Sequence, residues 1–244
     1  MARMHGKDVR VYLGKRDVSG DLVSIDVSAT AETHDITTFA SADHRQAKAG
    51  LKVWEASFAA LYETEAAPNV TTIGRQLESL IGVNTAGAAV VSVYVDDADS
   101  SGDTGWLGGE ATLTKMSQPV SVADLIKITA TLQGNGGLGL NAALLSPLAT
   151  VSTTANGASV DNGVATTAGY RANLHVTSVT GTGGTIKVQH SSDNTVWVDL
   201  TTFAAVTAAT SETRDATGTV NRYARAVASI NASSSVTFVV GIAR

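Results

Sequence analysis

The sequence contains no cysteine, which excludes disulfide frameworks, thiol catalysis and cysteine-ligated zinc sites. Aromatic residues make up only 5% and charged residues 16% of the 244-residue chain. The formal net charge of -5 argues against a domain that grips phosphate backbones with a basic face. The longest apolar run, Ala88–Val95, is broken at Ser92 and is too short to cross a bilayer. The N-terminus has no apolar stretch behind its charges, so we expect no signal peptide.

Small residues are abundant instead, and charge and composition divide the chain in two. Residues 1–146 carry 11 basic and 17 acidic residues, whereas residues 147–244 carry 6 and 5. The glycine-rich stretch that begins at Gly134 lies just before this change, and a flexible stretch of this kind is typical of a linker. We therefore expect one domain over residues 1–146, a second over 147–244, and a boundary near 134–150.

The first part is predicted to consist mostly of strands. Leu22–Thr30 and Asp124–Gln133 alternate apolar and polar residues, which is typical of an antiparallel sheet with one buried face. In Asn69–Gly82, apolar residues recur at helical spacing, with Asn69 or Thr71 as N-cap candidates and Gly82 at the C′ position. Further strands are expected at residues 9–13, 51–62, 88–95 and 111–116.

The second part is predicted to consist of strands throughout. These are expected at residues 171–179, 185–190, 197–201, 204–210, 221–229 and 236–242. Seven or so short strands in about a hundred residues are typical of a β-sandwich. The predicted fold class is therefore mainly β: an N-terminal β-barrel or sandwich with one packed α-helix, followed by a C-terminal β-sandwich domain.

Three motifs match catalytic or binding patterns without the context that these need. Residues 134–139 fit G-x-G-x-x-G, and Asp161 lies where a ribose-binding acid would sit, but the preceding strand alternates and no second parallel strand follows. Asp103-Thr104-Gly105 has no matching partner for an aspartic-protease dyad. Asp97–Asp103 starts like a calcium loop, yet position 12 is Gly108, which leaves only weak calcium binding open.

The five histidines do not cluster, and no His-x-His or His-Glu-x-x-His motif exists. His175 and His190 fall in separate predicted strands, so we expect surface or interface histidines. We accordingly expect no enzyme, no catalytic residues, no metal and no cofactor.

One segment carries a recognisable pattern. A strand leads to Asp35-Ile36-Thr37-Thr38-Phe39, then to a polar loop, then to Gly50-Leu51-Lys52 and a strand with Trp54 and Phe58. A second match runs from Gly108 to Gly137 and ends in a glycine-rich exit. Over about residues 8–146, this pattern resembles the tail tube (major tail) proteins of long, non-contractile-tailed bacteriophages. Residues 148–244 resemble, more weakly, the β-sandwich modules appended to such proteins.

The resemblance implies a structural virion protein of the phage tail, assembled in the host cytoplasm. Such proteins form hexameric rings whose sheets join into a closed inner barrel, and the rings stack into a tube that DNA crosses during ejection. The implied partners are further copies of the chain, a tape measure protein, tail tip and terminator proteins, and viral DNA that passes without specific binding. A net negative lumen would repel the phosphates and let DNA slide without binding. The candidate lumen acids are Asp26, Glu32 and Glu55.

The loop over residues 39–50 would then be an interface element between subunits or rings, because loops of this kind carry contacts. Its candidate interface residues are Thr38, Phe39, Asp43, His44, Arg45 and Lys48. An ordinary exposed hairpin loop is the alternative.

A different class of function stays open, namely a carbohydrate- or receptor-binding β-sandwich protein whose C-terminal module binds cell-surface glycans. Sugar sites present exposed aromatic rings as stacking platforms. The aromatic residues available there are Tyr170, Trp197, Phe203, Tyr223 and Phe238. Several lie at alternating positions of predicted strands, which favours the core.

Overall fold

The structure is a computed structural model that describes residues 6–38, 44–62, 72–83, 89–95, 105–120 and 125–244. The fold is mainly β, as predicted, and α1 (Ile73–Leu80) is the one α-helix in these ranges. Within them, no helix is long and apolar enough to cross a membrane.

Four long antiparallel strands pair in the order β3–β4–β7–β6. Their bounds are β3 (Leu22–Asp35), β4 (Ala47–Leu61), β7 (Lys127–Gly134) and β6 (Gly105–Ser117). One face is apolar because every second residue is buried in β7 and in β4 from Trp54 onward, including Trp54, Phe58, Ile128 and Leu132. We call this four-stranded unit the long sheet.

The apolar face of the long sheet is covered by a second layer. β6 turns from the long sheet into this layer and pairs there with β5 (Val90–Tyr94). β5 pairs with β1 (Arg10–Leu13), and β1 with β2 (Arg16–Asp17), after a 3-10 turn at Gly6–Asp8. The helix α1 adds its own buried residues to the core between the layers. This core holds Val11, Leu13, Trp54, Phe58, Ile73, Leu77, Val91, Leu113, Ile128 and Leu132, among others.

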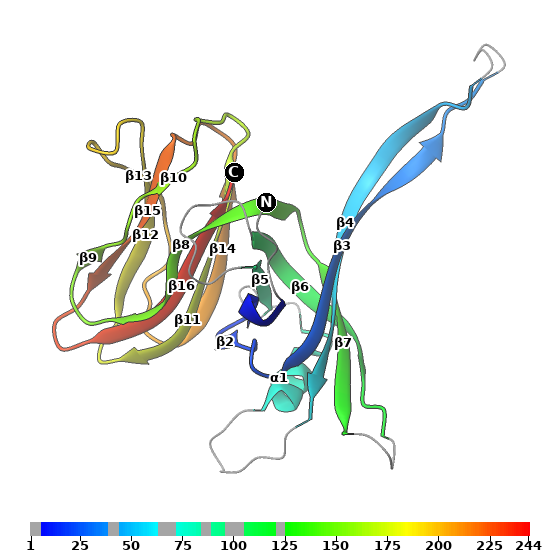
Figure 1. Ribbon diagram of the computed structural model, residues 1–244, viewed down its shortest axis with the longest axis horizontal. Coiled ribbons are helices and arrows are strands. Elements are labelled where there is room, and N and C mark those ends of the chain that lie inside the picture. The colour runs from blue at the N-terminus through cyan, green and yellow to red at the C-terminus, as the bar shows by residue number, and fades with distance from the viewer. Residues whose placement is uncertain (1–5, 39–43, 63–71, 84–88, 96–104, 121–124) are drawn as a thin grey trace.

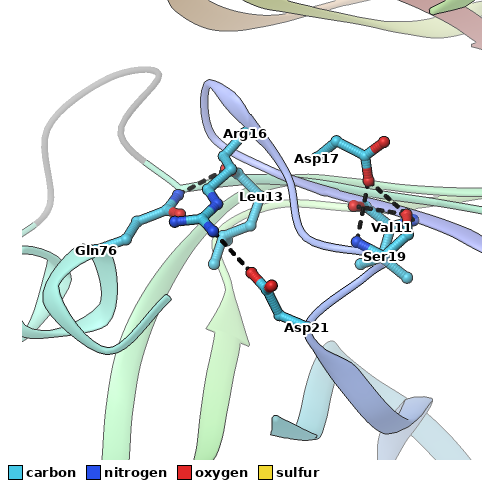
Figure 2. A network of polar contacts seen from close by, with 7 residues as sticks. All are labelled: Val11, Leu13, Arg16, Asp17, Ser19, Asp21 and Gln76. Atoms are coloured by element: carbon cyan, nitrogen blue, oxygen red, sulfur yellow. Dashed lines mark hydrogen bonds and ion pairs between the residues drawn. The ribbon is translucent and has the colours of Figure 1, made fainter. Parts of the chain in front are cut away.

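Polar contacts fix the corner where β1 turns into β2 (Figure 2). The side-chain amide of Gln76 in α1 donates to the Leu13 carbonyl at 2.8 Å, which ties the helix to β1. Arg16 and Asp21 form an ion pair at 2.9 Å across the turn. The Ser19 hydroxyl accepts from the Val11 amide at 2.8 Å. The corner thereby holds α1 against the layer that backs the long sheet.

The C-terminal part is a β-sandwich, as predicted. One layer runs β14 (Thr210–Ala216), β11 (Tyr170–Thr180), β16 (Ser235–Ala243) and β8 (Leu138–Val151). The other layer contains β9 (Ala155–Asn156), β10 (Val160–Asp161), β15 (Tyr223–Ile230), β12 (Gly184–Ser191) and β13 (Val198–Thr202). Their inward side chains form a second core that includes Leu174, Val188, Phe203, Phe238 and Ile242. We call residues 147–244 the outer module (left in Figure 1).

The expected glycine linker is instead a short connection between paired strands, because Gly134 ends β7 and the long strand β8 begins at Leu138. β8 pairs with β6 at Leu138 and Gly139, and farther along it pairs with β16 at Ala149 and Val151. It therefore makes one continuous sheet from strands of both parts. The glycines serve close approach, because a Cβ on Gly134 would overlap the Trp54 indole ring. The division at residue 146 stays a prediction, since β8 crosses it.

Other expected elements differ in their limits. α1 begins at Ile73 after Thr72, and the proposed caps Asn69 and Thr71 lie outside the described residues. Gly82 has a φ of 69°, as expected for a glycine that ends a helix. The strand expected at 204–210 is wrong: residues 204–209 form no strand, apart from a single bridge between Val206 and Gly184, and β14 begins at Thr210. β14 was missed because its sequence, TSETRDA, has no apolar alternation.

Candidate functional site

The second face of the long sheet is uncovered and polar. The side chains on this face alternate with the core residues, as in Glu55 and Ser57 of β4 on either side of buried Ala56. On β3, Asp26 and Ser28 lie on the same side because they pair with Ser57 and Glu55. The other members are Thr129, Thr131 and Gln133 of β7 and Thr112, Lys115 and Ser117 of β6. We call this surface the hydroxyl face.

Hydroxyl contacts run across the strands of this face. The Ser117 and Thr129 hydroxyls lie 2.6 Å apart, and the Ser57 and Thr131 hydroxyls lie 3.4 Å apart. The Ser57 hydroxyl also donates to the Glu55 carboxylate at 3.3 Å. These side chains satisfy one another's hydrogen-bonding groups across the strands, so the face consists mainly of small polar side chains.

The structure brings two of the three candidate lumen acids together on the hydroxyl face. Asp26 and Glu55 are both exposed there, on neighbouring strands. Glu32 continues the alternation of β3 farther along, where the strand has left the rest of the sheet. The face also carries two lysines, Lys115 and Lys127. Two acids and two lysines therefore balance on the face itself, and Glu32 adds a negative charge only farther out, on the ribbon.

Beyond Trp54, β3 and β4 continue as a two-stranded ribbon that projects from the body (upper right in Figure 1). This ribbon, residues 30–53, is the arm. Its described residues are exposed, apart from half-buried Gly50. Leu51 is 74% exposed, and Ile36 and Val53 are also exposed. An isolated two-stranded ribbon is marginally stable in water, so an arm with exposed apolar side chains is suited to lie on another surface.

The arm replaces much of the predicted polar loop, since pairing extends to Asp35 and Ala47. Arg45 forms an ion pair with Asp35 at 3.1 Å. Hydrogen bonds from the Thr37 hydroxyl and amide, with the help of Arg45, hold the pKa of the Asp35 carboxyl below its usual range. Of the predicted interface residues, Thr38, His44, Arg45 and Lys48 lie in the arm, while Phe39 and Asp43 fall outside the described residues.

Both edges of the long sheet remain accessible. In the described ranges, β3 pairs with β4 alone, so its second edge is open. At the opposite side, Ile81 forms a bridge with Leu113 of β6, but among the described residues the part of β6 after Leu113 pairs with β7 alone. Open edges present unpaired backbone donors and acceptors to a further strand.

No family model matches the sequence, and no curated protein matches it either. Among solved structures, the chain is similar to a chain in the virion of a native gene transfer agent particle. That match has 16% identity over 57% of this chain and 99% of the other, with a TM-score of 0.43. A chain of the SPP1 tail tube matches with 11% identity over 57% and 80% of the two chains, at a TM-score of 0.43.

A third similar structure is the SPP1 Dit protein, a hub protein of the adsorption apparatus of phages. It matches with 10% identity over 95% of this chain and 98% of the other, at a TM-score of 0.36. The matched structures are thus chains of a gene transfer agent virion, a phage tail tube and a phage adsorption hub.

A buried polar network joins the two cores, and the sequence did not reveal it. His175 of β11 is fully buried, with Nδ1 2.7 Å from the Gly14 carbonyl oxygen and Nε2 2.7 Å from the Ser92 hydroxyl. Asn173 donates to the carbonyls of Val91 and Gly108. Burial lowers the pKa of His175 to about 4, so the ring is neutral at pH 7. The expectation of a surface or interface histidine is therefore wrong for His175, whose ring is fully buried inside the chain.

The aromatic residues of the outer module offer little stacking surface. Phe203 and Phe238 are buried in its core. The Arg225 guanidinium lies over the Trp197 ring at 4.1 Å, and Arg222 lies over Tyr223 at 5.0 Å. Within the described ranges there is also no group of three or more potential metal ligands.

Proposed function

We propose that this chain is a structural virion protein that self-assembles into stacked hexameric rings and forms the tube of a phage tail, through which DNA passes during ejection. The observation that carries the proposal is the long sheet itself: one face packed on the core, one uncovered hydroxyl face, and two open edges. These three features are typical of a sheet whose edge strands pair with the edge strands of further copies of the chain.

The strand order supports ring formation. The four strands alternate in direction, so the edge strands β3 and β6 run antiparallel to each other. A second copy in the same orientation would therefore place its β3 antiparallel to the β6 of the first. This contact joins two different surfaces, and repeated contacts of this kind close into a ring when the rotation permits.

The mass distribution favours curvature toward the hydroxyl face. Helix α1 and the backing layer lie on the other side of the sheet. Their bulk keeps adjacent copies farther apart on that side, so the joined sheets curve toward the hydroxyl face. Six copies of four strands give 24 strands, and at the usual strand spacing and a tilt of about 40° the barrel diameter is about 48 Å. Barrels of this size leave an open lumen, which the hydroxyl face would line.

A lumen surface without net positive charge has a testable consequence. Tubes assembled from the Glu55→Lys variant are expected to retain duplex DNA at low salt and release it at high salt, because added positive charge binds phosphates. Wild-type tubes are expected to retain none. Electrophoretic retention of DNA by purified tubes, measured at several salt concentrations, tests this. Equal retention by both proteins would contradict a lumen role for Glu55.

The arm would hold successive copies or rings together. Replacement of Leu51 by aspartate is expected to change the free energy of unfolding by less than about 0.5 kcal/mol, because the side chain is exposed in the single chain. The same change is expected to abolish tube formation if the arm lies on another copy.

The matched control is Val164→Asp in the outer module, where Val164 is 71% exposed. This variant should assemble like the wild type. Sedimentation of assembled material and thermal unfolding together separate the two effects. Normal tubes from the Leu51→Asp protein would show that the arm is an ordinary exposed hairpin.

In this proposal the protein acts in the virion, after assembly in the host cytoplasm, beside a tape measure protein and tail tip and terminator proteins. Its outer module lies on the outside of the tube, because the core and α1 separate it from the hydroxyl face. There it is placed to meet cell-surface glycans or to decorate the tube. No catalytic step is assigned to any residue.

A further inference from the structure

Directly paired residues form a row that crosses the long sheet from one edge to the other. Asp26 of β3 pairs with Ser57, Ser57 with Thr131, and Thr131 with Lys115 of β6. We call this the partner row. Closing a sheet into a barrel requires tilted strands and a staggered register. For about 24 strands tilted by about 35–45°, the stagger is about 24–35 residues in all, or about four to six at each of six seams. In the proposed ring, Lys115 therefore faces a residue of the next copy other than Asp26.

The connection from β4 to β6 gives the direction of this stagger. These two strands are parallel and are joined through α1 on the core side of the sheet, and crossovers of this kind are right-handed. Seen from the core side with β4 pointing up, the order from left to right is therefore β3, β4, β7 and β6. Sheet twist makes the strands of a barrel rise to the right in this view, so the partner row descends to the right. Because β3 points down, the row meets the next β3 nearer to the arm than Asp26.

The pleat and the edge of β6 indicate the size of the stagger. Successive side chains alternate between the two faces, so only an even stagger keeps the hydroxyl face continuous. A stagger of about four residues makes the shear equal to the strand number, as in eight-stranded barrels with a tilt of about 36°. Ile81 occupies the edge of β6 at Leu113, whose row would reach Val27 in the body of the next β3 if there were no stagger. With this stagger Leu113 faces Ala31 instead, where the arm leaves the body.

We propose that Lys115 of one copy pairs with Glu32 of the next copy across a seam staggered by about four residues. The inference rests on the proposed ring, and it names the residues that align neighbouring subunits. In this register Lys115 lies opposite Thr30, and its diagonal neighbours are Ser28 and Glu32, which a long side chain can reach. The Glu32 side chain is 60% exposed, and its carboxylate lies 3.9 Å from the His34 ring. Lys115 is exposed and forms no ion pair within the part of the chain that the structure describes.

Cysteine cross-linking tests the stagger directly, because the chain has no cysteine of its own. The full-length protein with Thr30→Cys and Lys115→Cys is expected to form covalent species of up to six chains on mild oxidation. Directly opposed residues have Cβ atoms about 4.5–5.5 Å apart, close to disulfide geometry. The control combines Asp26→Cys with Lys115→Cys. It should cross-link on the order of tenfold less, because Asp26 lies about 13 Å from Thr30 along β3.

Charge exchange tests the ion pair independently. Glu32→Lys or Lys115→Glu alone is expected to raise the protein concentration for half-maximal assembly about fivefold or more at low salt. The double exchange should return it to within about twofold of wild type. Asp26→Lys combined with Lys115→Glu is the matched control. It should show no such recovery, because Asp26 lies beyond the reach of Lys115 in the staggered seam.

The outcomes separate this inference from the proposed function. Wild-type rings together with equal or preferential cross-linking of the Asp26→Cys pair, or with purely additive effects of Glu32→Lys and Lys115→Glu, would overturn the staggered seam pair and leave the ring intact. Wild-type protein that never assembles would overturn the ring, and the seam pair with it. Selective cross-linking through Thr30→Cys and recovery by the double exchange would support both.

Discussion

Replacing Gly134 by alanine is expected to lower the free energy of unfolding by about 3 kcal/mol, because the new methyl group would overlap the buried Trp54 ring. The indole ring also contacts the position where a Cβ on Gly108 would lie, so it is held between two strands and has little room to move. A loss of this size corresponds to a fall in Tm of about 6–12 °C for a chain of this length. Thermal unfolding of the two proteins measures it.

Two further variants identify the cause. Gly20→Ala is the matched control, since a Cβ there meets nothing within 4 Å, and its stability should stay within about 0.5 kcal/mol of wild type. Adding Trp54→Phe to Gly134→Ala should cost less than the two single changes together, because the smaller ring relieves the overlap. Strict additivity, or an unchanged Gly134→Ala protein, would show that the ring does not occupy this slot.

Lowering the pH from about 6.5 to 4 is expected to destabilise the protein by about 3 kcal/mol through His175 alone. Burial lowers the pKa of His175 to about 4 in the folded chain, whereas the unfolded chain takes up the proton near its usual value. Between these values the unfolded state binds more protons, so stability falls as pH falls. Hydrogen bonds from Arg222 lower the pKa of Asp161 to about 2, so Asp161 acts mainly below this range.

Urea unfolding at a series of pH values tests the role of His175. His175→Leu should be less stable at pH 7 by about 2–4 kcal/mol, because the Ser92 hydroxyl and the Gly14 carbonyl lose their partner. Its stability should, however, fall about 3 kcal/mol less than that of the wild type between pH 6.5 and 4. His34→Gln, which changes an exposed arm residue, should keep the full fall. An unchanged pH profile in His175→Leu would contradict a neutral, buried ring.

The mainly β fold and the hydroxyl face could be predicted from local pattern. The alternation of Ile25 and Val27 with Asp26 and Ser28 specifies both a strand and which side faces the core. The alternation in β7 does the same for its threonines. Of the three predicted lumen acids, Asp26 and Glu55 lie in the body of the sheet, and both are therefore on its uncovered face.

The remaining elements depend on contacts between distant residues. β8 begins among glycines that locally suggest a linker. Only contacts such as that of Gly139 with Ala243, where an added Cβ would come within 2.6 Å, show why a small residue is needed there. The arm extends β3 and β4 without apolar alternation, because ladder hydrogen bonds continue where side chains give no signal. The burial of His175 likewise follows from its docking on Gly14 and Ser92, which are far away in the sequence.

Negative-stain electron microscopy of the purified full-length protein, over a range of concentrations, tests the central claim most directly. We predict hollow rings that stack into tubes as the concentration rises. Uniform small particles without rings, even at the highest concentration or with a nucleating tail tip, would contradict the account and favour a binding function for residues 147–244.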